Sequence, residues 1–159
     1  MPIFARNELG TDSTGLGVLL FAFGLGAVVA SLFWAMFSEL RNVGKSMIAS
    51  VIVWHASILV FATSQSFFLS MAILAVTGTG FASTQVFMLS SLLGNSRPEF
   101  RGRVMSLRSL AIYAFALGSM TSGATAGIWS APVAATVVGT MGIVLVIILA
   151  VLTPKLRRL

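Results

Sequence analysis

The long uncharged stretches of this chain hold very few side chains that could do chemistry, and His55 is the first of them. It is the only side chain in those stretches that could titrate near neutral pH. An ionisable group in a membrane segment is a functional candidate by default. The alternative is a neutral imidazole that donates one hydrogen bond to a neighbouring helix, since Ser50 and Ser57 offer partners but no acid.

Gln85 is the second candidate. Thr84 precedes it directly and Met88 follows three residues later, so a helix could place the three side chains on one face. A single amide beside methionine suits a large, mostly apolar ligand held by few polar contacts. An interhelical hydrogen bond from Gln85, worth about 1 kcal/mol, is an equal alternative.

Carboxylates are missing from all these stretches, and the chain has no cysteine. Acid–base catalysis and metal binding both need clusters of acids, histidines or thiolates. The sequence therefore predicts no enzyme activity, no metal site and no cofactor.

The elements that must position these residues are membrane-spanning helices. Hydrophobic residues make up 57% of the chain, charged residues 9%, and mean hydropathy is +1.01. The uncharged run 46–96 would measure roughly 77 Å as one helix, whereas a bilayer core is about 30 Å thick. That run must cross twice. One crossing before Glu39 and two after Ser109 complete an all-α, polytopic membrane protein with five transmembrane helices.

Turn and cap residues set the expected boundaries. Asp12 is placed to cap the first helix, the polar residues 63–66 form a turn, and Trp129 is an aromatic anchor at the interface. The expected segments are an outer N-terminal segment 1–14, spans at about 15–37, 47–62, 67–93, 104–128 and 133–153, and a basic tail 154–159.

Basic residues fall on one side of this topology. Five crossings put every lysine and arginine except Arg6 on the same side, which is the cytoplasmic side by the positive-inside rule. The N-terminus is then outside and the C-terminus cytoplasmic. The net charge of +6 is explained by this asymmetry and by the lipid bilayer, with no nucleic-acid partner.

Small residues recur within the spans at spacings typical of close helix packing. For these small residues, helix packing is favoured over a hinge or ligand role. Dimerisation through Gly123 and Gly127 is a weaker alternative. These residues are Gly24, Gly26, Ala30, Gly78, Gly80, Gly123 and Gly127.

Several phrases resemble the C-terminal half of a major facilitator transporter. Residues 1–6 and 14–17 resemble the outer loop entering its second helix, and 101–107 resemble the cytoplasmic loop before helix eleven in the drug-efflux and siderophore-exporter-like branch. Residues 38–45 are similar to a degenerate signature loop, in which Ser38 replaces glycine and Glu39 replaces aspartate. The resemblance implies a gating or cytoplasmic-loop role for Glu39, Arg41, Gly44, Lys45, Arg101, Gly102 and Arg103.

The resemblance also implies a function. The five spans match helices eight to twelve, so the chain looks like most of one half of a secondary active transporter in a bacterial plasma (inner) membrane. The expected activity is export of a small hydrophobic or amphipathic compound. Alternating access needs two halves, so the chain is expected to require the N-terminal half or a partner subunit and not to transport alone.

The matching helices give roles to the candidate residues. The span with Gln85, Thr84 and Met88 matches helix ten, which lines the central pathway, and Tyr113 would be the contribution of helix eleven. The span with His55 matches a peripheral helix, which favours a packing role for that residue.

Two questions stay open at this point. The cytoplasmic arginines and Glu99 either form a latch of ion pairs or set topology and contact anionic lipid.

A non-transporting membrane scaffold or regulatory subunit is the alternative to a transporter, and an oligomeric pore is less favoured because no span has a continuous polar stripe.

Overall fold

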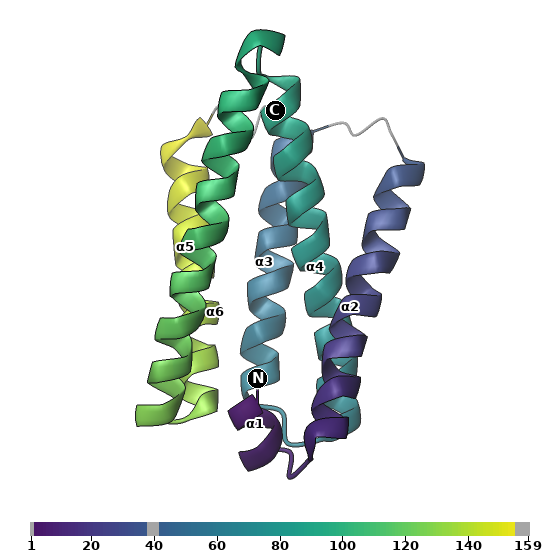
Figure 1. Ribbon diagram of the computed structural model, residues 1–159, viewed down its shortest axis with the longest axis vertical. Helices are drawn as coiled ribbons and strands as arrows, with labels where there is room; N and C mark the ends of the chain where they lie inside the picture. The colour runs from purple at the N-terminus through teal and green to yellow at the C-terminus, as the bar shows by residue number, and fades with distance from the viewer. Residues whose placement is uncertain (1, 38–41, 155–159) are drawn as a thin grey trace.

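The computed structural model describes residues 2–37 and 42–154, including all their side chains except those of 111, 112 and 114–116. Within these residues the chain is helical throughout, with no strand (Figure 1). The elements are α1 (Pro2–Asn7), α2 (Ser13–Met36), α3 (Val43–Ala62), α4 (Phe67–Gly94), the short 3-10 helix η1 (Pro98–Phe100), α5 (Arg101–Ile128) and α6 (Ala131–Leu152).

The long helices run up and down alongside one another (Figure 1). Packing passes from α2 to α4, from α4 to α3, and from α3 to α6, while α5 packs mainly against α6. The starts of α2, α4 and α6 lie at the same end as α1, and the starts of α3 and α5 lie at the other end. Residues on α2, α3 and α4 can therefore meet at one level in the bundle.

Four helices are long and apolar enough to cross a membrane among the residues that the structure describes: α2, α3, α4 and α6. The expected all-α, polytopic membrane bundle is thereby confirmed. Helix α5 has 28 residues, which is about 42 Å at 1.5 Å per residue and exceeds a bilayer core of about 30 Å. Its role as a fifth span stays a prediction.

Helix boundaries differ from the expected ones mainly at helix starts. Helix α3 begins at Val43 rather than near 47, directly after Asn42, whose φ of 61° lies in the left-handed region. Helix α5 begins at Arg101 rather than near 104, because η1 leads into it without a break. The N-terminal segment 1–14 contains the short helix α1. Asp12 is confirmed as the cap of α2, and its carboxylate accepts a 3.0 Å hydrogen bond from the backbone N–H of Gly15.

Helices α2 and α4 cross at two glycines. A methyl group on Gly26 would overlap the backbone carbonyl of Ala75, and one on Gly78 would overlap that of Phe23. Backbones approach this closely only where the side chain is a hydrogen atom, so the predicted packing role is confirmed for this pair. By contrast, nothing lies within 4 Å of the same position on Gly24, Gly123 or Gly127 in the described structure.

The end of the bundle where α2, α4 and α6 start is closed by α1. Phe4 and Ala5 of this helix are buried, and the Phe4 ring stacks on Phe61 of α3 with centroids 4.3 Å apart. Leu19 of α2 and Leu74 of α4 belong to the same cluster. This cluster fixes the positions of α2, α3 and α4 relative to one another below the middle of the bundle.

Candidate functional site: an aromatic and amide face at mid-bundle

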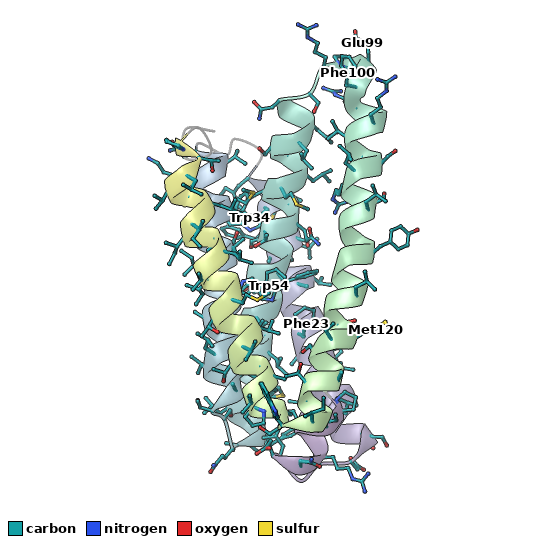
Figure 2. The ribbon with its side chains drawn as sticks, turned by 90° about the vertical axis from the view of Figure 1, so that its left-hand side faces the viewer. Phe23, Trp34, Trp54, Glu99, Phe100 and Met120 are labelled. Carbon is teal, nitrogen blue, oxygen red and sulfur yellow. The ribbon has the colours of Figure 1, made fainter. Side chains whose placement is uncertain are left out.

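Three aromatic rings meet near the midpoints of three helices. Phe81 of α4 lies 5.7 Å from Phe23 of α2 and 5.1 Å from Trp54 of α3, measured between ring centroids. Figure 2 shows Phe23 and Trp54 at the middle height of the bundle, away from both ends. All three rings are only partly buried. The arrangement places partly exposed aromatic surface near half the length of the bundle.

Gln85 and Met88 extend this surface along α4. They follow Phe81 by four and seven residues, which places the three side chains in one row on the helix. Both side chains are partly exposed, and the Gln85 amide makes no hydrogen bond to any residue that the structure describes. The amide is therefore free to contact a ligand. We call Phe23, Trp54, Phe81, Gln85 and Met88 the mid-bundle face.

Thr84 differs from its neighbour Gln85 in that its side chain has hydrogen-bond partners among the described residues. Its hydroxyl oxygen lies 3.2 Å from Ser50 Oγ of α3 and 2.8 Å from the backbone carbonyl oxygen of Gly80, so its single proton can be donated to either acceptor. Thr84 thus joins α4 to α3, and its hydroxyl is already engaged. Thr84 lies three residues after Phe81 and four before Met88, so it shares this side of α4 with Gln85 and Met88. The grouping of Thr84, Gln85 and Met88 in a substrate cavity stays a prediction.

Tyr113 lies on α5 and is 69% exposed. Because α5 packs mainly against α6, the structure does not bring Tyr113 onto α4 beside Gln85. Its contribution to a substrate cavity stays a prediction.

His55 is positioned by its own helix and by α6. Its Nδ1 lies 2.9 Å from the carbonyl oxygen of Val51, one turn earlier on α3. The imidazole also occupies the space beside Gly142 of α6, where a methyl group would overlap the ring. The hydrogen bond is therefore made within α3 and not to a neighbouring helix. This geometry fits a packing role.

Of the expected gating residues, those that the structure describes lie at one end of the bundle. Glu39 and Arg41 are outside the described residues. Gly44 is buried and Lys45 exposed in the first turn of α3, and Arg101, Gly102 and Arg103 are exposed in the first turn of α5.

Among the residues that the structure describes, no ion pair joins the charged side chains at this end. The guanidinium of Arg103 lies over the ring of Phe100 at 5.8 Å from its centroid, a weak cation–π contact. Glu99, which lies beside Phe100 at the tip in Figure 2, makes no ion pair among the described residues. The ion-pair latch expected around Glu99 therefore has no ion pair among the described residues, and it stays a prediction.

The opposite end carries Arg6, Glu8 and Asp12. The hydrogen bond from the Gly15 backbone N–H lowers the pKa of the Asp12 carboxyl below its ordinary value. The described residues contain no group of three or more histidines and acids that could hold a metal ion. Binding at the mid-bundle face would therefore rest on aromatic contact and on the Gln85 amide.

Phe23 and Phe81 were not singled out from the sequence. Aromatic residues are frequent in the spans, so composition alone does not distinguish these two from lipid-facing ones such as Phe21 and Phe68. A usable signal was their place at the centres of their spans, next to the small residues that bring α2 and α4 together.

The fold and this face define a polytopic helical membrane protein with a mostly apolar contact surface at half depth. The family model of the Major Facilitator Superfamily matches residues 1–158. The chain belongs to this family of membrane transporters. No curated protein and no solved structure matches the chain.

Proposed function

We propose that the chain forms most of the C-terminal half of a secondary active exporter, matching helices eight to twelve. Its substrate is a small hydrophobic or amphipathic compound. The observation that carries this proposal is the mid-bundle face, where three partly exposed aromatic rings and one unpaired amide occur together at half depth. Ligand sites are typically apolar with few convergent polar groups, and this face has that composition.

The chemistry of the face favours a neutral or weakly polar substrate. Aromatic rings and Met88 provide polarizable contact area, and the Gln85 amide can both donate and accept a hydrogen bond. No carboxylate lies in the described spans to couple substrate movement to protons. The coupling group, and the second wall of the cavity, are supplied by the N-terminal half or by a partner subunit, so this chain does not transport alone.

The proposed orientation has the N-terminus outside and the C-terminus in the cytoplasm of a bacterial inner membrane. It is supported by the positions of Lys45, Arg97, Arg101 and Arg103, which lie at one end of the bundle, while Arg6 lies at the other.

Efflux of a hydrophobic dye from inverted vesicles tests the proposal. Vesicles with this chain alone should show no efflux, and vesicles with the chain plus its complementary half should show it. Phe81→Ala and Gln85→Ala should each lower efflux by about tenfold or more at equal protein abundance, because each removes contact area or the amide from the face. Phe68→Ala, on the same helix but 76% exposed, is the matched control. Equal efflux by the Phe81 and Phe68 variants would contradict the site.

A membrane scaffold or regulatory subunit is the second candidate function. The observation that favours it is the free surface beside Gly123 and Gly127, which no described residue covers and which could receive a partner helix. Stable capture of a partner, together with no effect of Phe81→Ala on any transport activity of that complex, would favour this candidate.

A further inference from the structure

Arg108 differs from the other arginines near the start of α5. Arg101 and Arg103 are exposed, whereas Arg108 is partly buried, on the same side of the helix as the partly buried Val104 and Met105. Its Nε is buried and has no hydrogen-bond partner within the described residues. A guanidinium nitrogen in this position is an unsatisfied donor on a permanent cation.

No described acid can satisfy this group. Glu8 and Asp12 lie at the opposite end of the bundle, and Glu99 makes no ion pair. Leaving a buried donor of a charged group unpaired is strongly unfavourable, and a lone cation within a membrane protein is normally paired. The acceptor for Arg108 must therefore come from outside the described residues.

The position of Arg108 in the helix limits what that acceptor can be. The residue lies seven positions after Arg101, which is about 10 Å along the helix. Side chains on a helix lean toward its N-terminus, so the Arg108 guanidinium reaches back toward the basic end, near headgroup depth. Arg101 lies on nearly the same face, because seven residues are close to two full turns. A phosphate at this depth could contact both guanidinium groups.

We propose that Arg108, with Arg101, binds the phosphate of an anionic phospholipid headgroup at the α5 end of the bundle. The phosphate oxygens accept hydrogen bonds from Arg108, including its Nε–H, and Arg101 adds a second positive charge. Guanidinium groups suit this task because they bind phosphate with two parallel hydrogen bonds. This lipid site is separate from the mid-bundle face and does not depend on the transport function.

Thermal unfolding of the purified full chain in detergent tests the site. Phosphatidylglycerol, phosphatidylcholine and inorganic phosphate are each titrated against the native chain, Arg108→Gln and Arg103→Gln. The control residue Arg103 is exposed, lies on the same helix and carries the same charge. Phosphatidylglycerol should raise the melting temperature of the native chain and of Arg103→Gln. The apparent dissociation constant for this lipid should rise about tenfold or more in Arg108→Gln, because a charged hydrogen-bonding group is lost.

The other outcomes overturn the proposal. Equal weakening in the two variants would mean diffuse attraction to the basic end, and an equal effect of phosphatidylcholine would mean that the anionic charge is not recognised. A response to inorganic phosphate as strong as to the lipid would assign the site to a free anion. If Arg108→Gln does not fold, Arg108→Lys decides: this variant keeps the charge but lacks Nε, so native-like lipid affinity would refute the role of the guanidinium.

Discussion

The indole Nε1 of Trp34 donates a 2.7 Å hydrogen bond to Oγ of Ser83, which links α2 to α4 near the basic end of the bundle. Phe87 packs against the indole with ring centroids 4.7 Å apart, and both Ser83 and Phe87 are buried. The two helices are thus joined by the glycine crossing at mid-bundle and by a polar contact nearer their basic ends.

A double-mutant cycle measures the Trp34–Ser83 contact. Ser83→Ala should destabilise the chain by about 0.6–2 kcal/mol, the range for interhelical hydrogen bonds in membranes. Trp34→Phe together with Ser83→Ala should cost less than the sum of the single changes, because each single change removes the same bond. The measurement is unfolding in mixed detergent micelles. Thr79→Ala is the control, since Thr79 is only partly buried and its hydroxyl bonds to its own helix. Strict additivity in the cycle would contradict the contact.

The crossing of α2 and α4 at glycines can be tested by comparing alanine substitutions at glycines that do and do not make contact. Gly26→Ala and Gly78→Ala should each destabilise the chain by about 1–3 kcal/mol, because the added methyl group meets backbone that cannot move aside easily. Gly24→Ala, on the same helix as Gly26, should be neutral or slightly stabilising, since its methyl group meets nothing within 4 Å and alanine favours helix. The same unfolding assay ranks the three variants. A loss of stability in Gly24→Ala as large as in Gly26→Ala would contradict the described crossing.

Much of this fold could be predicted from the sequence because the bilayer thickness limits the length of each apolar segment that crosses it. Uncharged runs longer than a bilayer must turn, and Asp12 and residues 63–66 mark where helices begin or turn. The packing role of Gly26 and Gly78 also followed from residue size. Which glycines make contact did not, because Gly24 and Gly26 differ only in the side of α2 on which they lie.

The candidate site was predicted less well. Gln85 was singled out because an amide is rare in an apolar segment, and its role stays a prediction. The hydrogen-bond partner of Thr84 was not predicted, because it depends on how α3 is rotated against α4. Phe23, Trp54 and Phe81 come from three helices, so their meeting depends on tertiary packing that local sequence patterns do not encode. The hydrogen bond of His55 to Val51 was missed for a different reason: an interhelical partner was expected, and the nearest acceptor was one turn away on the same helix.

Asp12 should make the stability of the chain depend on acid pH. Its carboxyl pKa is lowered from the ordinary 3.8 by the Gly15 N–H, so the cap contributes stability above pH 4 and loses it as the pH falls through the folded-state pKa. Asp12→Asn keeps a capping side chain but does not titrate. Thermal unfolding at pH 7 and pH 3 should show a larger loss for the native chain than for Asp12→Asn. Asp12→Ala should be less stable than both at pH 7. Parallel losses in the native chain and Asp12→Asn would contradict the cap.

The contact between His55 and Gly142 tests whether the imidazole is a packing element. Gly142→Ala places a methyl group in the space of the ring and should destabilise the chain by about 1–3 kcal/mol. Adding His55→Ala removes the ring, so the double variant should recover part of that loss, and the two changes should show a favourable coupling. Gly127→Ala is the control, since its added methyl group meets nothing within 4 Å.

Unfolding in mixed micelles at pH 7 measures the stability of the native chain, Gly142→Ala, His55→Ala and the double variant. The double variant can recover stability only if the methyl group and the ring compete for the same space between α3 and α6, as the structure describes. If His55 instead acted by titrating in a transport pathway, its replacement would change the pH dependence of efflux in the assembled carrier and leave the effect of Gly142→Ala unrelieved. A double variant at least as unstable as the sum of its parts would therefore refute the packing role.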